Sequence, residues 1–364
     1  MVKNVIERTK ENDSARKIAD FKVKQAQDYS FKKKYAAVRA WEFYSHPDIA
    51  GNCYVAVGGL DSITLLLFLR SIGIDVPAVS VSTLEDKSIQ AVHKALGVQA
   101  LKPLKSKVEV IREFGWPVLS KEISKNISRL QNPTPQNAVT RHAVITGIKA
   151  DGTRSKRMKL AKKWLERFGG YENENEGVNY QKPDFPVSDQ CCWYMKELPL
   201  SIYARETGQF PYEGLMASEG GRRALMLPQT GCNYISPGTK RSCPFAIFSR
   251  QDLLELALEL NAPVPEIYGE IVRDPDGTLR TTKAQRTGCS MCGFGIHLEK
   301  RPHRFDQLWA RNPGEWEMWM NHVDQLPDGT WYGWGHVLDY IGVEWREPWR
   351  QFETQVSLFE GGHT

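Results

Sequence analysis

Two pairs of cysteines stand at spacings that suit metal chemistry. Cys289 and Cys292 form a CxxC motif on a glycine-rich segment, and Cys191 and Cys192 are adjacent at the start of an expected helix. A CxxC spacing lets two thiolates bind one metal ion or cluster, whereas adjacent cysteines make strained disulfides. Together the pairs supply four thiolates, enough for a [4Fe–4S] cluster or a zinc ion. Four unrelated buried thiols are the alternative reading.

A glycine turn after the first expected strand is a second candidate site. Residues 55–62 read VAVGGLDS, and Gly58 and Gly59 let backbone N–H groups approach an anion closely. The helix that follows adds its unpaired N–H groups and its positive dipole end. Asp61 and Ser62 fall in its first turn, where the Ser62 hydroxyl can donate to a phosphate oxygen. The Walker A pattern is absent, so an ordinary strand–helix turn is the alternative.

The elements that must position this turn alternate along the chain. Apolar runs predict strands at 54–57, 77–81, 98–104 and 211–217, and helices at 62–72, 87–96, 108–114, 192–207 and 251–260. One or two amphipathic helices are expected over residues 5–45. Strand and helix in regular alternation predict an α/β fold with a doubly wound, mainly parallel, Rossmann-like sheet.

Composition places the chain among soluble globular proteins. Of its 364 residues, 41% are hydrophobic and 25% are charged, which excludes wholesale disorder. The most apolar stretch, residues 63–69, is far shorter than the roughly 20 residues that span a bilayer. The beginning of the sequence is polar and lysine-rich, unlike a secretory signal. A cytoplasmic protein with reduced cysteines and no membrane partner is expected.

Positive charge is concentrated in two segments. Residues 1–40 hold 11 Lys/Arg against 5 Asp/Glu, and residues 154–168 hold seven basic residues against Glu166 alone. The second segment is expected to form a basic helix. Solvated helix faces explain most such runs, and a nucleic-acid backbone bound by both segments is the alternative.

The glycine turn resembles the SGGxDS pyrophosphate loop of the adenine-nucleotide α-hydrolase (PP-loop) superfamily. Four positions match, while Val57 stands where a serine is usual and removes one hydroxyl donor. The resemblance implies that the chain binds ATP with Mg²⁺. It also implies nucleotide contacts at Val57, Gly58, Gly59, Leu60, Asp61, Ser62, Thr83, Glu219 and Arg223.

The order of the cysteines is similar to the CC…CxxC signature of adenylyl-sulfate reductases and of the wider phosphoadenylylsulfate (PAPS) reductase-like family. That family includes phage proteins and sulfur-activating subunits of DNA phosphorothioation systems. Segments 115–122, 191–208 and 216–223 resemble further motifs of the family. The resemblance implies a [4Fe–4S] cluster, with zinc as the alternative, held by Cys191, Cys192, Cys289 and Cys292.

The family resemblance implies an ATP pyrophosphatase or sulfurtransferase that activates a substrate by adenylation, with Asp61, Ser62 and Cys232 as catalytic residues. A sulfur donor such as a cysteine desulfurase and a nucleic-acid acceptor are expected partners. The first alternative is a PAPS or adenylyl-sulfate reductase; those enzymes use a C-terminal nucleophilic cysteine, and no cysteine follows Cys292. Cys232 could substitute, or be an ordinary buried residue. The second alternative is a non-catalytic nucleic-acid-associated protein with a structural metal.

Three parts of the chain are expected from these patterns. Residues 1–48 form a basic helical arm, and residues 49–262 form the PP-loop nucleotide-binding domain, with a polar lid at about 131–190. Residues 263–364 form a cysteine- and tryptophan-rich subdomain that completes the Fe–S site and contains seven of the 11 tryptophans.

Overall fold

The computed structural model describes residues 2–81, 85–169, 182–289 and 291–352. Contacts divide the chain into two compact units. The first consists of residues 1–103 and 196–290, and the second of residues 104–195 and 291–364. Each unit is discontinuous in sequence.

The first unit is built on a six-stranded sheet in the order β3-β2-β1-β4-β6-β5. Its strands are β1 (Cys53–Ala56), β2 (Ala78–Ser80), β3 (Gln99–Ala100), β4 (Phe210–Glu213), β5 (Asn233–Ser236) and β6 (Thr239–Ser242). All neighbours are parallel except β5 and β6, which pair as a hairpin. The predicted α/β fold with a mainly parallel sheet is therefore confirmed. The strand order reverses between β1 and β4, the place where doubly wound sheets bind ligands.

Seven helices of the first unit are described: α1 (Val2–Gln25), α2 (Tyr29–Ser45), α3 (Leu60–Ser71), α4 (Lys87–Ala95), α10 (Leu198–Thr207), α11 (Gly221–Thr230) and α12 (Arg250–Glu259). Short turns η5 (Ala217–Glu219) and η6 (Glu266–Tyr268) and the hairpin β7 (Ile271–Arg273) and β8 (Leu279–Thr281) complete it. No described helix is long and apolar enough to cross a membrane.

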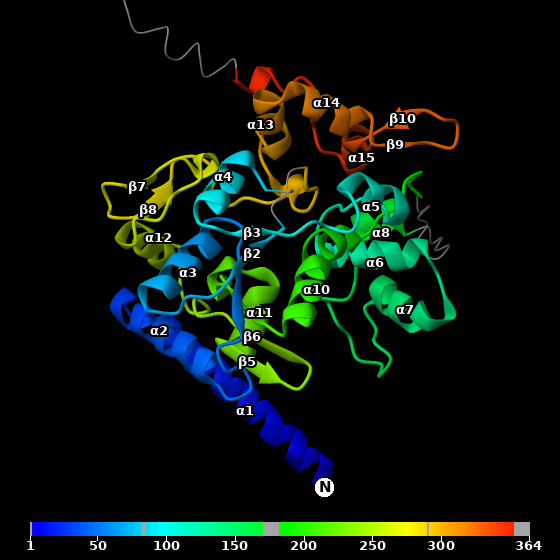
Figure 1. Ribbon diagram of the computed structural model, residues 1–364. Helices are drawn as coiled ribbons and strands as arrows, with labels where there is room; N and C mark the ends of the chain where they lie inside the picture. The colour runs from blue at the N-terminus through cyan, green and yellow to red at the C-terminus, as the bar shows by residue number, and fades with distance from the viewer. Residues whose placement is uncertain (1, 82–84, 170–181, 290, 353–364) are drawn as a thin grey trace, which may run out of the picture. The chain divides into compact units, whose positions relative to one another are not determined.

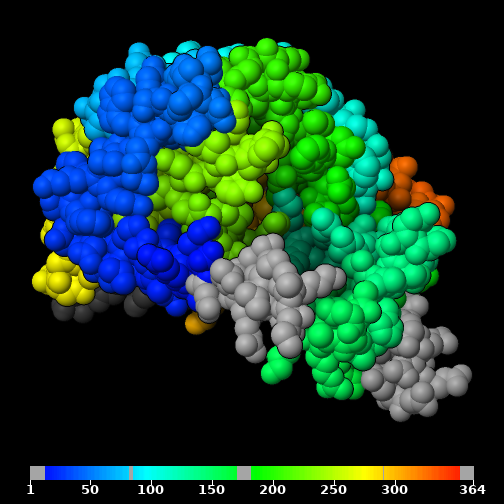
Figure 2. All heavy atoms as spheres, turned by 90° about the horizontal axis from the view of Figure 1, so that it is seen from below, coloured from blue at the N-terminus to red at the C-terminus, as the bar shows by residue number. Residues whose placement is uncertain are grey.

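The N-terminal helices belong to the core of the first unit. In α2, Ala36, Ala40 and Phe43 recur at helical spacing and are fully buried. The hydroxyl of Tyr212 in β4 donates to the Ala40 carbonyl at 2.7 Å, which joins α2 to the sheet. Figure 1 shows α12 beside α2 and α3, and Figure 2 shows α1 and α2 in blue against the yellow-green segment of α11, β5 and β6.

The second unit is mainly helical. Its elements are α5 (Lys107–Phe114), α6 (Lys121–Gln131), η2 (Pro135–Asn137), α7 (Ala138–Thr146), α8 (Lys162–Phe168), α9 (Gln190–Cys192), η7 (Ile296–Leu298), α13 (Arg304–Arg311), α14 (Pro313–Asn321), the hairpin β9 (Asp324–Gln325) and β10 (Trp331–Tyr332), and α15 (Trp334–Ile341). Its core centres on Trp116 and Trp334, whose rings meet edge to face with centroids 4.8 Å apart.

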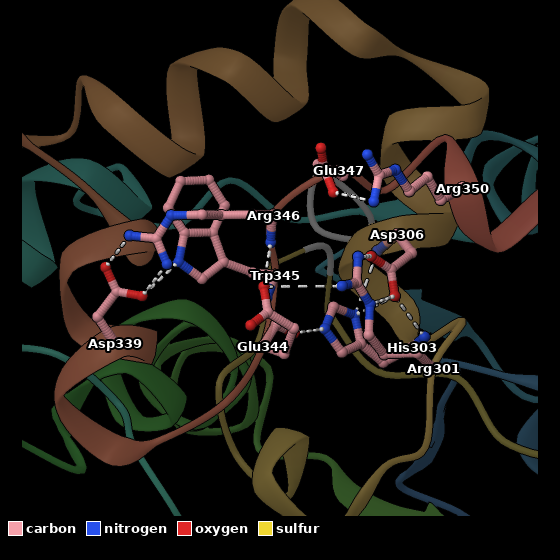
Figure 3. Close-up of polar contacts among 9 residues, drawn as sticks. All are labelled: Arg301, His303, Asp306, Asp339, Glu344, Trp345, Arg346, Glu347 and Arg350. Carbon is pink, nitrogen blue, oxygen red and sulfur yellow. Dashed lines mark hydrogen bonds and ion pairs between the residues drawn. The ribbon is translucent and has the colours of Figure 1, made fainter.

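Polar contacts fix the last described part of the second unit (Figure 3). Asp306, fully buried at the start of α13, accepts two hydrogen bonds from the Arg301 guanidinium, at 2.7 and 3.1 Å. His303 Nε2 lies 3.0 Å from the Glu344 carbonyl oxygen. The Asp306 carboxylate thus fixes the loop before α13, and the contact of His303 with Glu344 joins that loop to the segment after α15.

The units differ from the three parts expected from the sequence. Residues 131–169 and 182–190 of the expected lid belong to the second unit because their apolar residues share a core with the tryptophans of α14 and α15, and residues 170–181 lie outside the described residues. Residues 263–290 belong to the first unit because Tyr268 and Leu279 pack with Leu60, Ile89 and Leu254.

Two predicted helices also differ. The prediction of a helix over residues 154–168 was wrong for its first half, because only α8 (Lys162–Phe168) is helical there. There the N–H groups of Ser155 and Leu160 donate to the carbonyls of Gly147 and Val144, which holds the chain in a turn. The expected helix 192–207 is divided into α9, a π-helical turn at Trp193–Glu197, and α10, because Pro199 has no N–H and fits the first turn of a helix.

Candidate functional site

A cavity of about 450 Å³ lies in the first unit where β1, β2 and β4 end. Seven of the residues predicted to contact nucleotide or act in catalysis line it: Val57, Gly58, Gly59, Asp61, Ser62, Glu219 and Arg223. Of the other predicted residues, Leu60 is fully buried in the core behind the turn, and Thr83 lies outside the described residues. The structure thus brings the glycine turn and segment 216–223 to one cavity.

Hydrogen bonds from two elements, α3 and α4, hold the glycine turn in shape. Ser62 Oγ accepts from the Gly58 N–H at 2.7 Å and donates to the Gly59 carbonyl at 3.0 Å. His93 of α4 lies with Nε2 2.8 Å from the Gly58 carbonyl, so this nitrogen donates. Burial lowers the pKa of His93 despite that bond, which keeps the ring neutral. Each contact acts on backbone, so the turn is preformed at the amino end of α3.

A glycine is required at position 59. A Cβ atom there would lie 2.3 Å from the hydroxyl oxygen of Tyr268. That hydroxyl accepts from the Leu60 N–H at 3.2 Å and lies 2.7 Å from Thr287 Oγ1. Residues more than 200 positions away therefore complete the floor of the turn, and sequence analysis did not identify them.

Asp61 and Arg250 form an ion pair at the cavity wall, with Nη1 and Oδ1 2.6 Å apart. Burial raises the pKa of Asp61, and the Arg250 charge opposes that rise. In the part of the chain that the structure describes, the buried Nε and Nη2 groups of Arg250 have no hydrogen-bond partner. Unpaired guanidinium donors at a cavity wall suit an oxyanion. Arg250 stands at the start of α12, and no sequence motif marked it.

A second ion pair joins Lys196 and Glu85 at 2.8 Å. Burial lowers the pKa of Lys196, but its interactions with Cys289 and with the Glu85 carboxylate outweigh burial and raise the pKa overall. The ammonium group therefore stays charged beside the cavity. Lys196 lies within segment 191–208, whose family resemblance was the signal that could have identified it.

Glu213 at the end of β4 also lines the cavity. Burial raises the pKa of its carboxyl group, and Arg241, 3.6 Å away, opposes the rise. The thiol of Cys243 lies 3.8 Å from the same carboxyl group. Gly214 follows, and a Cβ there would come 3.0 Å from the Ser62 N, so the absent side chain lets β4 approach the first turn of α3.

The structure does not bring Cys232 to the cavity of Asp61 and Ser62. Cys232 lines a separate cavity of about 210 Å³, together with Lys17, Asp20, Phe21, Lys24, Tyr35, Pro228, Gln229, Thr230 and Gly231. Burial raises the pKa of its thiol to about 12. A protonated thiol is a poor nucleophile, so this environment does not activate Cys232.

The four cysteines of the predicted cluster are divided between the units. Cys289 belongs to the first unit, and Cys191, Cys192 and Cys292 belong to the second. Cys191 is buried and the others are half-buried. Among the described residues, no three Cys, His, Asp or Glu side chains are placed to hold one metal ion. Binding of a cluster or a zinc ion by these four cysteines therefore stays a prediction from the sequence.

No family model matches the chain, and no curated protein matches it. One similar solved structure is a phosphoadenylyl-sulfate (PAPS) reductase from Candida auris in complex with phosphate. The match covers 67% of this chain and 89% of that chain, with 12% sequence identity and a TM-score of 0.34. A likeness at this level adds nothing to the sheet topology described above.

Proposed function

We propose that the first unit binds an adenine nucleotide, with a phosphate group on the Gly58–Gly59 turn. The single observation that carries the proposal is the set of unpaired Arg250 donors in a cavity at the switch point of the sheet, beside the amino end of α3. Helix amino ends and free guanidinium donors both favour anions. The family resemblance of the turn supports adenine as the base.

The proposed reaction is adenylation with release of pyrophosphate. A nucleophilic oxygen of the acceptor attacks the α-phosphorus of ATP, the bond from that phosphorus to the bridging oxygen breaks, and pyrophosphate leaves. The backbone N–H groups of the turn, Arg250 and Lys196 would stabilise the charge that develops on the leaving group. Mg²⁺ would enter with ATP and neutralise part of the phosphate charge.

Calorimetric titration with Mg·ATP and a pyrophosphate–ATP exchange assay test this proposal. Mg·ATP should bind, and Arg250→Gln should weaken binding by about tenfold or more. Arg273→Gln is the matched control, because Arg273 pairs with Glu255 at 2.7 Å on the exposed surface and does not line the cavity. Absence of any binding heat, or equal effects of the two substitutions, would contradict the proposal.

We propose separately that Cys191, Cys192, Cys289 and Cys292 bind a [4Fe–4S] cluster, with zinc as the alternative, and that adenylation precedes sulfur transfer from a donor such as a cysteine desulfurase to a nucleic acid. The sequence pattern alone supports this part. Metal analysis and electron paramagnetic resonance of anaerobically purified, dithionite-reduced protein test it. Iron and sulfide at four each per chain are expected, and colourless protein containing zinc would favour the alternative.

A further inference from the structure

We propose that Arg223 and Arg286 together bind a second oxyanion of the nucleotide, distinct from the phosphate on the glycine turn. This inference rests on the proposed function, because it names the ligand class of the same cavity. Both arginines line the cavity, and both pair with the carboxylate of Glu219. Arg286 comes from a segment that no sequence motif marked.

The ion pairs around the cavity leave one positive charge unbalanced at Arg223 and Arg286. Among the described lining residues, the other ion pairs match one base to one acid: Asp61 with Arg250, and Glu85 with Lys196. Glu219 instead serves two guanidinium groups, so one positive charge stays unbalanced there. The remaining acid of the lining, Glu213, has its own partner in Arg241. An anion that enters the cavity therefore meets excess positive charge at Arg223 and Arg286.

Glu219 is the buried member of this group, and Arg223 and Arg286 are more exposed. The Glu219 side chain is 6% exposed, whereas those of Arg223 and Arg286 are 42% and 58% exposed. Arg286 Nη2 lies 3.4 Å from the Glu219 carboxylate, and its Nη1 lies 3.4 Å from the Glu219 carbonyl oxygen. A buried carboxylate thus orients two guanidinium groups whose other donors remain accessible. A planar guanidinium group can donate two parallel hydrogen bonds to two oxygens of one phosphate or sulfate group.

The position of Arg286 is tied to the glycine turn. Its neighbour Thr287 contacts the Tyr268 hydroxyl, which accepts from the Leu60 N–H at the start of α3. Asp61, Arg250, Glu219, Arg223 and Arg286 all line the same cavity as the glycine turn. The ligand class that fits is an adenine nucleotide with two separate anionic groups. The second group extends the 5′ chain or sits on the ribose.

Calorimetric titrations with AMP, Mg·ATP and adenosine 3′,5′-bisphosphate test the inference. At least one of the two latter ligands should bind about tenfold more tightly than AMP. Arg286→Gln should reduce that ratio to about twofold or less and leave AMP affinity unchanged. Arg280→Gln is the matched control, since Arg280 pairs with Asp274 at 2.8 Å, is 51% exposed and lies outside the cavity. Whichever ligand binds more tightly than AMP shows whether the second anionic group lies on the 5′ phosphate chain or on the ribose.

Four outcomes would overturn the inference. If Arg286→Gln leaves the affinity ratios relative to AMP unchanged, or weakens AMP binding equally, Arg286 does not bind a second anion. Wild-type protein that binds all three ligands equally would refute the inference while leaving the proposed function intact. Wild-type protein that binds none of them would refute both. Arg286→Lys separates charge from geometry, because it keeps the charge without the fork and should restore the ratio only in part.

Discussion

At the scale of single residues, Ser62 shapes the glycine turn, since its hydroxyl bonds both the Gly58 N–H and the Gly59 carbonyl. Ser62→Ala should open the turn and weaken Mg·ATP binding by about tenfold, the effect of one to two hydrogen bonds. Titration calorimetry measures this. Ser71→Ala is the control, because Ser71 bonds the Phe68 carbonyl at the other end of α3 and should leave affinity unchanged. Equal affinities of wild type and Ser62→Ala would contradict this role.

The buried thiols predict a loss of stability at alkaline pH. The pKa of Cys232 is about 12 in the folded protein, against 9.0 for an unperturbed thiol. Between these values the unfolded chain binds fewer protons, so the free energy of unfolding falls as the pH rises, by up to ~1.4 kcal/mol per pH unit. Urea unfolding at pH 7.5 to 10.5 should show a shallower decline for Cys232→Ala than for wild type. Parallel declines would argue against a buried, protonated thiol.

The sequence predicted those site residues that are contiguous and missed those that tertiary contacts supply. Gly58, Gly59 and Ser62 form one motif whose geometry follows from a strand, a turn and a helix. Tyr268 and Arg286 lie in an irregular segment with no periodicity, and only the packing of that segment under the turn brings them to the cavity. Local spacing carries no information about such a contact.

At the scale of elements, α2 is anchored by a buried ion pair. Lys32 Nζ lies 2.9 Å from Asp252 Oδ2, with 8% and 10% of the two side chains exposed. Lys32→Ala leaves a buried carboxylate without its partner and should cost about 3 kcal/mol of unfolding free energy. Lys33→Ala, which removes a half-exposed pair with Glu259, should cost less than about 1 kcal/mol. Urea unfolding compares the two, and equal small losses would mean that α2 is only loosely attached.

The same pairing bears on the nucleic-acid hypothesis for the basic arm. The side chains of Lys24, Lys32, Lys33 and Arg39 each pair with an acid within the first unit. Ion pairs of this kind reduce the charge available to a phosphate backbone. The charge count of the arm, read from the sequence, therefore overstates its attraction for DNA or RNA, because a sequence does not show which acids lie opposite the lysines.

At the scale of the whole molecule, regular elements were predictable and the division of the chain was not. The strand β1 and helix α3 follow from dense apolar patterns, since burial on both sides requires nearly every residue to be apolar. The units are discontinuous, and their membership depends on which distant segments share a core. Tryptophans in α14 and α15 pack with apolar residues between Ile111 and Phe168 and with Phe185 and Val187, whereas the segment around Tyr268 packs with α3 and α12.

Two separate cores predict two unfolding transitions. Trp334 is fully buried in the core of the second unit, and Phe245 is fully buried in that of the first. Each replacement by alanine should cost about 3–5 kcal/mol and lower one calorimetric transition. Mg·ATP should raise the transition that Phe245→Ala lowers, because the nucleotide cavity lies in the first unit and a ligand stabilises the state that binds it. A single transition that both substitutions lower equally would show instead that the two cores unfold as one cooperative structure.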